Sequence, residues 1–110
     1  MFERFRARLT VAPKAQAPIR NPRDHMFDTL IAGTRLVPGI LKSDLAAIGT
    51  RDAYDDEYYA AFFTANRALL EQRLNESIAA VAAMIAGAWE AAGKPALPLD
   101  PPSSPQRRRR

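Results

Sequence analysis

The sequence lacks cysteine altogether and contains only one histidine, His25, among its 110 residues. Without cysteine, neither a disulfide framework nor thiolate chemistry is possible. A single imidazole also excludes a zinc site built mainly from histidine. No apolar run reaches the roughly 18 residues that a transmembrane helix needs, and no stretch resembles the apolar part of a signal peptide. The sequence therefore predicts a cytoplasmic protein, as the chain stands, with no transmembrane segment.

A strong charge of one sign is also missing from the middle of the chain, although the formal net charge is +4. Residues 1–23 carry six basic side chains against one acidic, and residues 94–110 carry five against one. Residues 24–93 carry five basic against ten acidic side chains, so the central part is mildly acidic between two basic ends. This distribution gives no strong nucleic-acid-binding signal for the central part.

A short amphipathic pattern opens the chain. In the stretch FERFRARL, the apolar residues Phe2, Phe5 and Leu9 are spaced three and four apart, which predicts a short N-terminal helix. Prolines then punctuate residues 13–22, where the apolar periodicity is poor. We therefore expect an extended connection between this helix and the next one.

A second helix is predicted from the stretch NPRD onward. Asn21 can cap it, Pro22 suits its first position, and Asp24 places negative charge in its first turn. Its helix-spaced apolar positions are Phe27, Leu30, Ile31, Val37, Leu41, Leu45 and Ile48. Pro38 removes a backbone hydrogen bond, so we expect a kink there. Because the apolar phase continues across Pro38, the pattern favours one bent helix over two separate ones.

His25 and Asp28 are the first candidates for a metal site, because residues three apart share one face of a helix. Two ligands do not complete a site, and the chain offers no further histidine or cysteine. We interpret His25 as an exposed or hydrogen-bonded residue of the first helical turn. The sequence thus yields no catalytic, cofactor-binding or metal-binding residue, and no cofactor is expected.

The strongest signal is a long helix over residues 55–92, which contain no proline and one glycine, Gly87. Asp52 or Asp55 can cap its start, and Gly93 followed by Pro95 is a typical stop. Its apolar stripe is Phe63, Leu70, Leu74, Ile78, Val81, Ile85, Trp89 and Ala92. At ~1.5 Å per residue the helix would be about 57 Å long. A compact domain of this size has a radius of gyration of about 13 Å, so we expect self-association or a helical partner to cover this stripe.

Aromatic residues cluster at the start of the long helix: Tyr54, Tyr58, Tyr59, Phe62 and Phe63. Such a cluster can form a ligand-binding box, but burial of large aromatic rings is so favourable that we interpret it as core.

The chain ends in ALPLDPPSSPQRRRR, which is rich in proline, serine and charge and has no apolar period. Residues 99–110 are therefore predicted to be a disordered basic tail that contributes nothing to folding. The run Arg107–Arg110 could bind nucleic acid or an acidic membrane. Without interleaved aromatic residues, it is interpreted as a solvated terminus.

Residues 24–98 resemble the C-terminal helices of bacterial proteins of the zinc-dependent phospholipase C and single-strand-specific nuclease superfamily. The segments that carry the resemblance are RLVPGIL, YDDEYY and GAWEAAGKPALP. This family is all-helical and binds three zinc ions through several His and Asp residues and an N-terminal Trp. Its members hydrolyse phosphoesters with a metal-activated water. The resemblance therefore implies a helical fold related to phosphoric-ester hydrolases.

The chain departs from that family because it contains none of the family's metal-ligand motifs, and no ligand can be carried over to it. His25 does not stand in the family's His-x-x-x-Glu or His-x-x-x-Asp pattern. The resemblance thus implies a C-terminal scaffold fragment that is non-catalytic as this chain. One alternative is a small helical module for dimerisation or protein interaction. A weaker alternative is a nucleic-acid or membrane-surface binder that uses the basic ends.

Taken together, these patterns predict an all-α chain with one helical unit over residues 1–98. We expect a short N-terminal helix, a Pro-kinked helix and a long C-terminal helix, followed by the basic tail over residues 99–110.

Because no set of three or four ligands exists, we predict that protein purified without a histidine tag carries no stoichiometric zinc. Elemental analysis of the purified chain measures this directly. One or more tightly bound zinc ions per chain would contradict the prediction.

Overall fold

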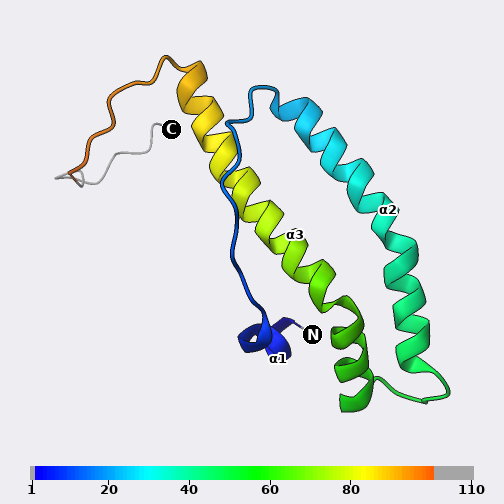
Figure 1. Cartoon of the computed structure of the whole chain (residues 1–110). Coiled ribbons are helices and arrows are strands. Elements are labelled where there is room, and N and C mark those ends of the chain that lie inside the picture. Colours follow the sequence, from blue (N-terminus) through cyan, green and yellow to red (C-terminus); the bar gives the residue numbers. More distant parts are fainter. Residues whose placement is uncertain (1, 101–110) are drawn as a thin grey trace, which may run out of the picture.

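The computed structural model describes residues 2–100, and all its regular elements in that range are helices, with no strand (Figure 1). Its elements are α1 (Phe2–Phe5), the 3-10 helix η1 (Arg6–Arg8), α2 (Pro22–Ile48) and α3 (Asp56–Ala91). The predicted all-α fold with a short, a middle and a long helix is confirmed. Most of the predicted tail, including Arg107–Arg110, lies outside the described residues.

The start of α2 has the predicted cap. The Asn21 side chain accepts a hydrogen bond from the backbone N–H of Asp24 at 3.1 Å, and Pro22 occupies the first helical turn. The helix continues without interruption through Pro38 to Ile48. This confirms the prediction of one helix. The half-buried side that faces α3 continues across Pro38, from Leu36 to Ile40, and its packing offsets the one backbone hydrogen bond that proline removes.

The long helix α3 begins at the second of the two cap candidates. The Asp55 side chain accepts a hydrogen bond from the backbone N–H of Tyr58 at 2.8 Å. This bond, assisted by Arg51, holds the pKa of the Asp55 carboxyl below its usual value. The helix ends at Ala91, and Gly93 takes a left-handed conformation with φ of 84° just beyond it. Glycine adopts that conformation without strain, so it terminates the helix as the sequence predicts.

Helices α2 and α3 lie side by side as an antiparallel hairpin (Figure 1). The molecule measures 59 × 33 × 32 Å, and its radius of gyration is 19.9 Å. A compact domain of this length would have a radius of about 13 Å. The buried core is correspondingly small and consists of Phe5, Ala47, Tyr58, Phe63, Ala83 and the polar Asn66.

Residues 9–20 form a strap that runs along α3 and joins the N-terminal helical turns to α2 (Figure 1). The backbone N–H of Thr10 donates to the Glu71 carboxylate at 2.8 Å, and that of Ala12 donates to the Asn75 side-chain oxygen at 2.9 Å. An advance of two residues along the strap therefore corresponds to an advance of four residues along α3, which is about 6 Å along the helix axis. The strap thus rises by ~3 Å per residue. That rise is close to full extension, so alternate N–H groups of the strap point at α3.

The far end of the strap is held by direct backbone contact. The N–H of Ile19 donates to the carbonyl oxygen of Ala83 at 3.0 Å. A Cβ atom at Gly87 would collide with the Ile19 carbonyl oxygen and would lie 2.8 Å from its carbonyl carbon. The strap can approach α3 this closely only because position 87 has no side chain.

Gly87→Ala is expected to lower the free energy of unfolding by about 1–3 kcal/mol, because the clash is with backbone and no rotamer change relieves it. The matched control is Gly39→Ala in α2, where a Cβ meets nothing within 4 Å. That change should raise stability by about 0.5–1 kcal/mol through helix propensity. Chemical denaturation of both variants measures the difference. Equal effects of the two substitutions would show that the strap does not rest on Gly87.

Candidate association surface

Helix α2 has an apolar stripe on its outer side and an inner side of mixed character, and only the inner side meets α3. The side facing α3 is half-buried and carries His25, Thr29, Gly33, Leu36 and Ile40. The predicted apolar stripe has the expected helical period, but all of it except Ile48 is exposed on another side of the helix. The exposed side chains of this stripe are Phe27, Leu30, Ile31, Val37, Leu41 and Leu45, and the neighbouring Met26 is exposed as well.

The apolar stripe of α3 is covered at one end and open at the other. At the N-terminal end, the Phe5 ring stacks on Phe63 with centroids 4.3 Å apart, and the Arg8 guanidinium lies 4.9 Å from the Phe63 centroid. Leu70 and Leu74 are half-buried. Beyond them the stripe is exposed at Ile78, Val81, Ile85 and Trp89.

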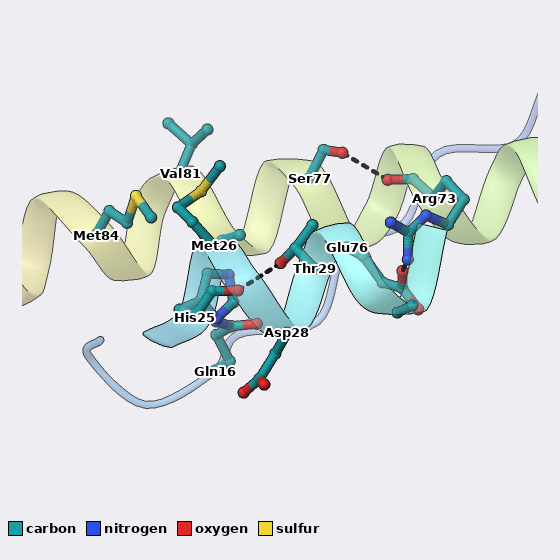
Figure 2. A pocket seen from close by; sticks show the side chains of 12 residues that line it. Gln16, His25, Met26, Asp28, Thr29, Arg73, Glu76, Ser77, Val81 and Met84 are labelled. Carbon is teal, nitrogen blue, oxygen red and sulfur yellow. Dashed lines mark hydrogen bonds and ion pairs between the residues drawn. The ribbon is translucent and has the colours of Figure 1, made fainter. Parts of the chain in front are cut away.

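Part of each exposed stripe lies on the same side of the hairpin. Met26 of α2 and Val81 of α3 line one pocket between the helices, and Figure 2 shows them on one side of it with Gln16 and Asp28 on the other. A helix turns by about 100° per residue, so Leu30, Val37 and Leu41 lie within about 60° of Met26. Ile78 and Ile85 lie within about 60° of Val81 by the same measure.

We call this surface the open face. It consists of the exposed side chains Met26, Leu30, Val37 and Leu41 of α2 and Ile78, Val81 and Ile85 of α3. The exposed Phe27, Ile31, Leu45 and Trp89 lie farther around their helices, beyond this face. The exposed fractions of the seven side chains of the open face, from 44% for Ile78 to 67% for Ile85, leave roughly 700 Å² in water, whereas the largest apolar patch on a typical monomer is about 300–600 Å². No charged residue occurs between Glu76 and Glu90.

A polar cluster joins the two helices near the hairpin loop. The Asn66 amide donates to the Ser43 hydroxyl at 2.8 Å and to the Phe62 carbonyl oxygen at 2.9 Å. The Tyr58 hydroxyl donates to the Asp44 carboxylate. Among the described side chains, no buried nitrogen or oxygen lacks a hydrogen-bond partner. This cluster fixes the register of the hairpin, because a shift of either helix would leave buried polar atoms unpaired.

The hydrogen bond to the Asp44 carboxylate, together with burial, raises the pKa of Tyr58 to about 12. A phenol that donates to a carboxylate loses this bond when it ionises, and it then faces a like charge. On the opposite side of α3, the Thr10 N–H and the Arg67 guanidinium lower the pKa of the Glu71 carboxyl. The first cause of each shift is therefore a contact that attaches another segment to α3, Asp44 of α2 for Tyr58 and Thr10 of the strap for Glu71.

The structure places His25 half-buried at the pocket between α2 and α3, where Asp28 also contributes to the lining (Figure 2). The backbone oxygen of His25 accepts a hydrogen bond from the Thr29 hydroxyl at 2.8 Å. Within residues 2–100, no three His, Cys, Asp or Glu side chains group in a way that could hold a metal ion. The side chains lining this pocket thus offer mixed polar and apolar contacts, and they complete no ligand set around His25.

The aromatic cluster forms a core at the end of the hairpin. Tyr58 and Phe63 are buried, and the Tyr58 ring stacks on Phe62 with centroids 5.8 Å apart. Tyr54 is the exception at 61% exposed, with its ring edge-on to Tyr58.

Sequence reasoning missed the residues that hold the strap. Glu71, Asn75 and Gly87 stand in one row of α3 with a spacing of four, together with two alanines. Such a row of small and hydrogen-bonding side chains is the signal that an extended segment crosses a helix closely. It was hidden because the apolar stripe dominated the pattern of the same helix.

Comparison with known proteins found no family model, no curated protein and no solved structure that matches the chain. Over residues 2–100, no helix has both the length and the apolar character needed to cross a membrane.

Because the folded-state pKa of Tyr58 lies above its usual value of 10.0, the hydrogen bond stabilises the fold fully below pH ~10 and is lost toward pH ~12. We expect tyrosinate absorbance to show a late component with a pKa of about 12. Tyr58→Phe should remove that component and reduce the alkaline loss of stability. The matched control Tyr54→Phe should retain it. A late component that survives in Tyr58→Phe would contradict the assignment.

Proposed function

We propose that this chain is a helical association module whose open face is covered by another apolar helical surface in its working state. The extent of the open face carries the proposal. Apolar surface contributes ~25 cal/mol per Å² when it leaves water, so covering a few hundred Å² stabilises the assembly by several kcal/mol. That is comparable with the whole stability of a small domain, about 5–15 kcal/mol.

The shape of the open face supports a helical partner. Two antiparallel helices present parallel rows of aliphatic side chains, and the shallow pocket at Met26 and Val81 lies between them. A helix packs into such a groove by placing its own ridge between two ridges of side chains. The described part of the open face offers no backbone edge to which a strand could add.

The resemblance to zinc-dependent phospholipases C and nucleases supports a second proposal, in which the chain is a scaffold fragment of such a hydrolase. In that case the rest of a larger helical domain would cover the open face. The DNA directly upstream of the Met1 codon tests this proposal. An in-frame extension that encodes His and Asp ligand motifs would support it, whereas an upstream region without such motifs would contradict it.

Site-specific photo-cross-linking in cells tests the association module. A photoreactive amino acid at Leu41, on the α2 row of the open face, should give a covalent adduct, because the face is expected to be covered. The matched control is Ala46 on the same helix, which is exposed but lies away from the open face. It should give little or no adduct. Equal labelling at the two positions, or none at Leu41, would contradict the proposal.

A further inference from the structure

We infer that the surface covering the open face is a second copy of this chain, so that two hairpins pack face to face as a four-helix bundle. The inference rests on the proposed association module and names its partner. It draws on the area of the open face, its lack of charge and its position in the hairpin.

The area is sufficient for a stable dimer. A standard protein interface buries about 800 Å² on each partner. The open face exposes roughly 700 Å² per copy, more than half of it on α2, where Leu30 is 62% and Leu41 is 57% exposed, and this lies within the range of about 600–1,000 Å² per partner for standard interfaces. Two copies that bury most of this surface reach the standard size without any other segment.

The chemistry of the open face is compatible with itself. Its two rows contain no charged side chain, so two copies can meet without burying an unpaired charge. Two cations lie at its rim: Arg23, which is 5.8 Å from the Phe27 ring, and Lys42, which follows Leu41 in the sequence. Both can keep their charged groups in water while their stems cover apolar surface.

The position of the open face limits the assembly to two copies. The strap occupies another side of α3, and α1 with η1 covers Phe63. Each described copy therefore offers one such face, shared by both long helices. Two faces related by a two-fold axis close on each other and leave none for a third copy. Two antiparallel hairpins packed in this way have the usual arrangement of a four-helix bundle.

The test measures the mass of the full-length purified chain by light scattering and sedimentation at micromolar concentration. We expect a dimer for the wild type and for Ala46→Glu, which adds a charge away from the open face. Leu41→Glu buries one carboxylate per copy in the interface, so its dissociation constant should rise by about a hundredfold or more. Because Leu41 is 57% exposed within one copy, the variant should keep its helical circular dichroism.

Ile85→Glu on α3 is the second variant, and it should also weaken the dimer, since Ile85 is 67% exposed. A folded wild-type monomer, or a dimer that survives both substitutions, would overturn the inference. If the wild type is monomeric while Leu41 cross-links to a different protein in cells, the association module stands and the second copy is wrong. If neither a dimer nor a cross-link forms, both proposals are wrong.

Discussion

The structure depends on how one 36-residue helix, α3, is covered by a chain that is too short to surround it. Helix α2 lies along one side of α3, and the strap crosses another side through side-chain and backbone hydrogen bonds. The N-terminal turns cover Phe63 at one end only. One side of the C-terminal half of α3 remains uncovered, and it lies beside the exposed apolar row of α2. The open face is the consequence of this partial coverage.

Polar side-chain contacts fix the register of the hairpin near its loop, whereas the apolar rows form its exposed surface. The bonds from Asn66 to Ser43 and from Tyr58 to Asp44 join the helices near the loop, where they fix the register of the pair. Toward the other end of the hairpin, a shallow pocket that Met26 and Val81 help to line lies between the two helices. Because register is already fixed near the loop, the two apolar rows stay aligned there. An aligned pair of rows is what a helical partner requires.

In both proposed roles, another surface covers the open face and removes it from water. They differ in the source of the covering surface, a second copy in one case and the rest of a hydrolase-like domain in the other. A self-compatible, uncharged face favours the second copy on the basis of the described residues. The resemblance in RLVPGIL and GAWEAAGKPALP supports the larger domain.

Local signals in the sequence determined the helices themselves. Asn21 and Asp55 begin them, Gly93 ends the longer one, and the apolar phase that continues across Pro38 predicted one helix for α2. The length of the apolar stripe on the long helix also predicted more apolar surface than the chain can bury. These features depend on residues within one or two turns of each other, so the sequence carries them directly.

Only the tertiary structure decided which side of α2 meets α3, because the period locates an apolar stripe but does not say what covers it. The inner face is built from small and polar residues such as Gly33 and Ser43, and these allow close approach and cross-helix hydrogen bonds. The strap depends on residues distant in sequence, with Thr10 meeting Glu71 and Ile19 meeting Gly87. Contacts of that separation leave no local pattern, and they set the position of the open face.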